Sequence, residues 1–225
     1  MSKPIRFLIG PRKTEFYVHS HFVPATFPIL RGPVHSKYAD ADRVVELNWA
    51  DETAFTALCQ YLYTGDYDES FTETSTKNPL LTNAHVYILA DRWEIRDLAR
   101  IALENIKPRP EPECTPQSNV VELVRYCCER VVPNELTQHL ADYLSDDLAA
   151  LRDKEVQAAL SKSREMSRAI ITVLVRRFSK GMILKKSATE SHLSASELQN
   201  VLDQLYATVH MMDQENDKLE DLAAL

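Results

Sequence analysis

Apolar and polar side chains alternate in three short stretches near the start of the chain. The first two are separated by the turn sequence Gly10-Pro11-Arg12-Lys13. Period-two alternation bounded by glycine and proline is typical of strand, turn and strand. The stretches predicted as strands are 5–9, 14–18 and 43–47. Residues 20–31 suit a helix in short pieces, because Pro24 and Pro28 interrupt it.

Helical spacing follows from residue 51 onward. Asp51 precedes Phe55, Leu58 and Leu62, which share one helix face, so Asp51 is expected to cap a helix that ends at Gly65. Residues 66–79 are mostly polar and predict a surface loop. Residues 80–105 are again predicted to be helical, with two successive apolar stripes.

A proline-rich segment then divides the chain. Four prolines lie between residues 107 and 116, which excludes a helix or a central strand there. Beyond it, three amphipathic runs predict helices over 120–131, 136–151 and 155–178, and Gly181 is expected to end the last one. We therefore expect an α+β domain followed by an all-α extension and a coiled-coil helix. The expected boundaries are 1–105 for the first domain, 106–119 for the linker, 120–190 for the helical extension and 191–225 for the C-terminal helix.

The sharpest periodicity lies in the C-terminal segment. Apolar positions there repeat with the 4, 3 spacing of a heptad seam, and a polar Asn216 at an a position is typical of two-stranded coiled coils. The segment is expected to form a homodimer, although an amphipathic helix packed on its own domain shows similar spacing. The seam consists of Leu198, Leu202, Leu205, Val209, Met212, Asn216, Leu219 and Ala223.

Composition excludes several classes of protein. The chain has only 4 glycines in 225 residues, and no glycine-rich phosphate-binding string is present. No Rossmann site or P-loop is therefore expected, and we predict no cofactor. The 4 cysteines include no C-x-x-C pair and are expected to be buried or idle thiols in a reducing compartment. No membrane span or secretory signal is recognised, so we expect a cytoplasmic or nuclear protein.

Charge is unevenly distributed along the chain. The net charge is −7, yet residues 161–186 carry eight basic residues and one acidic residue, Glu165. Such a block is usually a solvated helix face, but it also suits an acidic partner or nucleic acid. Net acidity argues against a dedicated DNA-binding protein. The basic patch comprises Lys162, Arg164, Arg168, Arg176, Arg177, Lys180, Lys185 and Lys186.

Three strings resemble the BTB/POZ family over about residues 5–105. They are Phe16-Tyr17-Val18-His19-Ser20, then Val44-Val45-Glu46-Leu47 with Tyr61-Leu62-Tyr63-Thr64-Gly65-Asp66-Tyr67, and Asn83-Ala84-His85-Val86-Tyr87-Ile88-Leu89-Ala90-Asp91-Arg92-Trp93. The chain looks most like the fungal members. The resemblance implies a small sheet capped by helices, with the histidine held by local hydrogen bonds. Ser20 is expected to serve as the N-cap of the first core helix.

The resemblance also implies a non-enzymatic interaction or scaffold protein. Tyr38, Asp40 and Tyr63 are its candidate partner-binding residues. Family members that serve cullin-type ubiquitin ligases carry a hydrophobic–x–acid segment, and Tyr38-Ala39-Asp40 is the nearest match, so a cullin adaptor is one alternative. Since there is no room before residue 5 for the N-terminal elements that exchange in swapped BTB dimers, we expect the C-terminal coiled coil to take the place of that dimer. A nuclear, transcription-associated regulator using the basic patch is another alternative.

Enzymatic chemistry has little in its favour. A catalytic pair of His19 and Ser20 lacks a third orienting group and a nucleophile elbow. His19 and His21 have no further metal ligand at usable spacing. We therefore predict no catalytic residue, no metal site, no small-molecule substrate and no direct nucleic-acid binding.

Overall fold

The computed structural model describes residues 4–23, 44–67, 78–106 and 117–179, and scattered helical residues between 200 and 214. The chain divides into two compact units, residues 1–107 and 108–225, and the division falls at the start of the proline-rich segment. That segment and Gly181 lie outside the described residues. Over the described residues the fold is mixed α and β, with a small three-stranded sheet and a majority of helix.

Three strands form the sheet of the first unit, in the order β2-β1-β3. β1 pairs antiparallel with β2 and parallel with β3. The alternating side chains Ile5, Phe7 and Ile9 of β1 are fully buried, so one face of the central strand supplies the core. The predicted strands are confirmed in their described residues as β1 (Pro4–Ile9), β2 (Thr14–His19) and β3 (Val44–Leu47).

The prediction that Ser20 caps the first helix is wrong. Ser20 is instead the first residue of a short 3-10 helix, η1 (Ser20–Phe22). His19 occupies the N-cap position with an extended backbone, and no side chain caps the turn. The Ser20 carbonyl accepts a hydrogen bond from the Val23 N–H at 3.3 Å, which closes the turn three residues on. The rest of the predicted helix lies outside the described residues.

The helix predicted after Asp51 is confirmed as α1 (Glu52–Thr64). The Asp51 carboxylate accepts hydrogen bonds from the N–H groups of Thr53 and Ala54, as an N-cap should. Gly65 follows in the left-handed conformation at φ 82°, where a side chain would strain the backbone. Phe55 is buried, and its ring packs between Phe7 of β1 and Trp93 at the end of α2.

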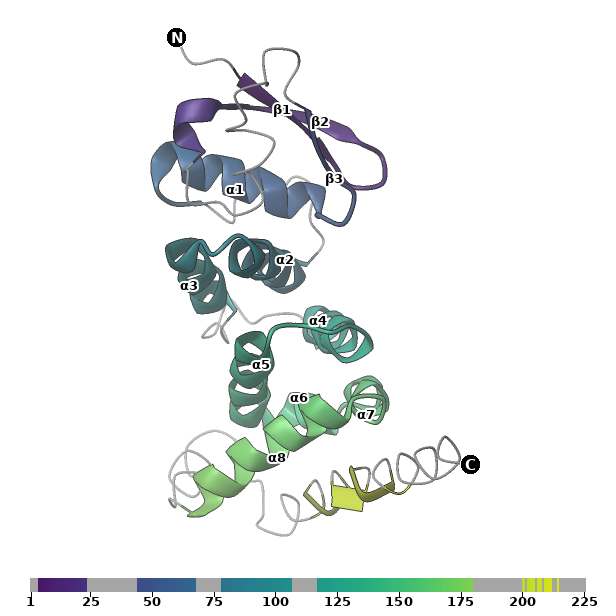
Figure 1. Ribbon diagram of the computed structural model, residues 1–225. Coiled ribbons are helices and arrows are strands. Elements are labelled where there is room, and N and C mark those ends of the chain that lie inside the picture. The colour runs from purple at the N-terminus through teal and green to yellow at the C-terminus, as the bar shows by residue number, and fades with distance from the viewer. Residues whose placement is uncertain are drawn as a thin grey trace, which may run out of the picture. The chain divides into compact units, whose positions relative to one another are not determined.

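The helical stretch 80–105 is two helices, α2 (Pro79–Arg92) and α3 (Arg96–Asn105). Glu94 has a positive φ of 58°, and the chain turns back there so that α3 packs on α2. The two apolar stripes therefore face each other. Asn78, predicted to end a loop, is the N-cap of α2, and its side-chain oxygen accepts from the Leu81 N–H at 3.2 Å. Figure 1 shows the sheet on one side of α1 and the α2–α3 pair on the other.

The second unit is helical in its described residues, but the three predicted runs are five helices. Asp147 and Asp153 each accept hydrogen bonds from N–H groups that follow them, so each begins a new helix. Asp153 lies in the predicted gap between residues 151 and 155, whereas the breaks at Asp147 and at residues 161–163 interrupt runs that were predicted to be continuous. α5 packs against α8, and α4 packs against α7. The helices are α4 (Gln117–Glu129), α5 (Asn134–Asp146), α6 (Leu148–Arg152), α7 (Lys154–Leu160) and α8 (Arg164–Ser179).

Length and hydropathy decide whether the helices in the described part of the chain could cross a membrane. None of the helices there is both long enough and apolar enough to span a bilayer.

Candidate interaction surface

Tyr63 and His19 contact each other although they lie 44 positions apart in the chain. The His19 backbone N–H donates to the Tyr63 hydroxyl at 3.2 Å, and His19 Nδ1 lies 2.8 Å from the same oxygen. One hydroxyl thus fixes both the end of β2 and the imidazole ring. Tyr63 nevertheless keeps 44% of its surface exposed, so its ring remains accessible.

Two neighbouring rings extend this contact into an aromatic surface, which we define as His19, His21, Phe22 and Tyr63. The Phe22 ring lies 4.3 Å from the Tyr63 ring and 3.9 Å from the His21 ring, measured between centroids. His19 and His21 are exposed, and Phe22 is half-buried. Rigid aromatic rings with polar atoms at their edges are the side chains that most often dominate protein–protein binding energy.

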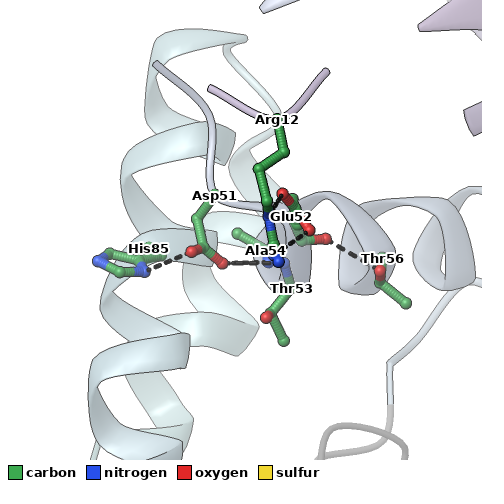
Figure 2. A network of polar contacts seen from close by, with 7 residues as sticks. All are labelled: Arg12, Asp51, Glu52, Thr53, Ala54, Thr56 and His85. Atoms are coloured by element: carbon green, nitrogen blue, oxygen red, sulfur yellow. Dashed lines mark hydrogen bonds and ion pairs between the residues drawn. The ribbon is translucent and has the colours of Figure 1, made fainter. Parts of the chain in front are cut away.

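The opposite end of α1 is anchored by a network around Asp51, shown in Figure 2. One carboxylate oxygen of Asp51 accepts from Thr53 and Ala54, while the other lies 3.6 Å from Nδ1 of His85 on α2. Glu52 pairs with the Arg12 guanidinium through two contacts of 2.8 and 3.0 Å. These contacts tie α1 to α2 and to the β1–β2 turn, so the helix that presents Tyr63 is held at its start.

The pKa of the Asp51 carboxyl reflects the same network. Burial alone would raise this pKa, but the contacts with His85 and with the N–H groups of Ala54 and Thr53 outweigh burial. The pKa of Asp51 therefore lies below its usual value. The charged form of Asp51 stabilises the folded first unit as a consequence.

A buried polar cluster holds the segment that follows α1. The Tyr67 hydroxyl donates to the Asn83 side-chain oxygen on α2 at 2.6 Å and accepts from the Asn105 amide on α3 at 3.4 Å. Tyr67 is almost fully buried, and burial raises the pKa of its hydroxyl far above the usual value. Its role here is therefore structural, since a neutral buried hydroxyl with two partners is neither exposed nor readily ionised.

The seam residues are partly described. Leu202 is buried and Val209 is half-buried, and both occupy a positions. Gln204 bonds to Gln157 of α7, with 3.1 Å between the two amide groups. The segment thus contacts its own chain at one end. The seam positions outside the described residues are Leu198, Leu205, Met212, Asn216, Leu219 and Ala223.

The described part of the basic patch lies around α8 and is not a uniform positive face. Arg177 pairs with the carboxylates of Asp146 at 2.5 Å and Asp142 at 3.5 Å, both on α5. Lys162 lies 3.9 Å from Glu129. Arg168 and Arg176 are exposed, and Arg164 is half-buried. Lys180, Lys185 and Lys186 lie outside the described residues.

The remaining predictions concern cullin binding, metal binding and the cysteines. Tyr38 and Asp40, the proposed cullin-contacting residues, lie outside the described residues. Among the residues that are described, no three His, Cys, Asp or Glu side chains gather as metal ligands. Three of the cysteines are free thiols, and burial raises the pKa of each to about 12, which disfavours the reactive thiolate; they are Cys59, Cys127 and Cys128.

Two features of the surface were missed by the sequence analysis. Phe22 and His21 join Tyr63, and the aromatic and imidazole density of residues 16–22 was the available signal. Trp49 is 41% exposed, and the Arg92 guanidinium lies 4.2 Å above its ring. No local pattern links Trp49 with Arg92, because the contact depends on how β3 and α2 are placed.

Comparison with known proteins gives no relative for this chain: no family model, no curated protein and no solved structure matches it.

Proposed function

We propose that this chain is a non-enzymatic protein-interaction scaffold of the BTB/POZ type, most similar to the fungal members of that family. The aromatic surface binds a protein partner, and residues 198–223 mediate self-association. Function in such a scaffold depends on complementary surfaces, and no bond is made or broken. Partner binding and self-association are supported by separate observations.

The contact between His19 and Tyr63 carries the proposal. These residues come from two of the three strings that resemble the family, so the contact brings the two strings together. The resemblance implies a histidine held by local hydrogen bonds, whereas Tyr63 lies 44 positions from His19. Both the ring and the backbone N–H of His19 contact the Tyr63 hydroxyl. The α+β arrangement of a three-stranded sheet with helices against it is also compatible with that fold.

The exposure of the aromatic surface supports a protein partner. A buried core position would leave no area for docking, whereas Tyr63 keeps 44% of its surface accessible beside the half-buried Phe22. Such anchors typically cost about 2 kcal/mol or more of binding free energy when truncated. A residue of this kind is therefore the natural target for a partner-binding test.

Affinity capture with mass spectrometry tests the partner. The full chain is compared with Tyr63→Ala and with Tyr17→Ala, a matched control in which a tyrosine on β2 that is 58% exposed is removed. We expect partners that are retained by Tyr17→Ala and lost by Tyr63→Ala. The two tryptophans of the first unit report by their fluorescence that each variant is folded. An identical set of partners for all three proteins would refute the proposed surface.

Sedimentation tests self-association. The apparent mass of the full chain should rise between about 5 and 200 μM, because association is driven by concentration. Leu205→Asp places a charge in the seam and should abolish the rise. Ala207→Asp places the same charge at an exposed f position and should not. A constant monomer mass for the wild-type chain would refute self-association.

A further inference from the structure

We infer that docking of the C-terminal helix on its own chain restrains self-association, so that the seam must be released before two chains can pair. This inference rests on the proposed self-association through residues 198–223. The observations that carry it are the burial of the described a positions and the Gln157–Gln204 contact.

Burial in the C-terminal helix follows the seam. Among its described residues, Leu202 is 8% exposed and Val209 is half-buried, and these are the two a positions. The other described residues of the segment are exposed; they are Asn200, Asp203, Gln204, Tyr206, Ala207, His210, Met211 and Gln214. At the two described seam positions, the side chain that a second chain would contact is therefore already covered within one chain, fully at Leu202 and partly at Val209.

The flank of the helix has a specific contact. Gln157 of α7 donates its side-chain N–H to the Gln204 side-chain oxygen at 3.1 Å. Gln204 occupies a c position, which lies outside the a/d seam of a two-stranded coiled coil. Gln157 lies 47 positions earlier in the chain and belongs to α7. The contact therefore belongs to the docked state and can be removed without altering the seam.

Docking of Leu202 leaves too little seam for stable pairing. Beyond Leu202, the remaining seam positions are Leu205, Val209, Met212, Asn216, Leu219 and Ala223. One of these is polar and one is small, and a sustained seam of about three to four heptads is what indicates a coiled coil. Pairing therefore requires Leu202 to leave its intramolecular site. The docked monomer and the released, pairing-competent chain are two states of one equilibrium.

The experiment uses sedimentation of the full chain with Gln157→Ala and, as the matched control, Gln138→Ala, which removes an exposed glutamine of α5. Losing one exposed amide contact should raise the released fraction about threefold. Because both partners must be released, the apparent dimer dissociation constant should fall about tenfold for Gln157→Ala. It should stay within about twofold of wild type for Gln138→Ala. Adding Met212→Asp to Gln157→Ala should abolish this gain in dimer affinity, because a charge then interrupts the seam.

The outcomes separate the two proposals. Equal dissociation constants for wild type and Gln157→Ala, with dimers in both, would overturn the docking equilibrium and leave self-association intact. Monomers throughout in both proteins would overturn self-association and the docking equilibrium together. Dimers in Gln157→Ala but not in wild type would support both.

A covalent lock gives a second, independent readout. Gln157→Cys and Gln204→Cys are combined with Cys114→Ser and joined by a short bis-maleimide, since the two amide groups are 3.1 Å apart in the docked state. The locked chain should remain monomeric at concentrations where the same variant without the linker forms dimers. Dimers formed equally by the locked chain would overturn the inference.

Discussion

Replacing Asp51 separates two contributions to the stability of the first unit. Asp51→Ala removes both the cap of α1 and the contact with His85, whereas Asp51→Asn retains a capping oxygen and loses only the charge. Loss of an N-cap costs about 1 kcal/mol. The partly exposed pair with His85 contributes roughly 0.5 kcal/mol. The expected losses in free energy of unfolding are therefore about 1.5 kcal/mol for alanine and about 0.5 kcal/mol for asparagine.

The assay follows tryptophan fluorescence during urea unfolding of the full chain. Both tryptophans, Trp49 and Trp93, belong to the first unit, so the signal reports that unit alone. Asp91→Ala is the control, because it removes an exposed aspartate from α2. It should change stability by no more than about 0.5 kcal/mol.

The pH dependence of the free energy of unfolding shows which protonation state of Asp51 stabilises the fold. The folded-state pKa of Asp51 lies below its unfolded value of about 3.9. Its charge therefore stabilises the fold fully at pH values well above 4, and that stability is lost as the pH falls through the folded pKa. The difference between wild type and Asp51→Asn should accordingly shrink below about pH 4. Equal stability of the alanine and asparagine variants, or a difference that grows on acidification, would refute the reasoning.

Three further predictions concern other parts of the chain. Tyr67→Phe removes the hydroxyl bonded to Asn83 and should cost about 1–3 kcal/mol in the same fluorescence assay; a loss under about 0.3 kcal/mol would contradict it. Arg177→Ala breaks the contact with Asp146 and should lower the second unit's melting temperature in circular dichroism, whereas the exposed neighbour in Arg176→Ala should leave it within about 2 °C. Three buried or half-buried cysteines should react at least about a hundredfold more slowly with a chromogenic disulfide at pH 8 in the native chain than in urea. Equal reaction rates in the two conditions would contradict their burial. They are Cys59, Cys127 and Cys128.

Several local features were predictable because short stretches of sequence encode them. The strands follow from alternation around Gly10, and α1 begins at Asp51 and ends at Gly65 as predicted. Each of these signals acts over a few residues: a side-chain oxygen beside free N–H groups, or a glycine where φ is positive. The α+β class followed from the same periodicities.

Helix breaks were harder to predict from periodicity. The apolar pattern runs through Asp147 and through Glu94, so one long helix and two packed helices have the same spacing. Asp147 is also a good N-cap residue, and that signal was available in the sequence. At Glu94, the turn is favoured because α3 then buries its stripe against α2.

The sequence by itself determined which residues are apolar, where the strands occur, that Asp51 and Gly65 bound α1, and that residues 198–223 carry a heptad spacing. Only the tertiary structure decided what meets over long separations, such as Tyr63 with His19 and Arg177 with the carboxylates of α5. It also decided that Leu202 is covered within a single chain. The physical reason is that a heptad seam and a core-facing stripe have nearly the same period. The spacing therefore shows that one face of the helix is apolar and will be buried, but it does not show whether that face packs on the same chain or on a second copy.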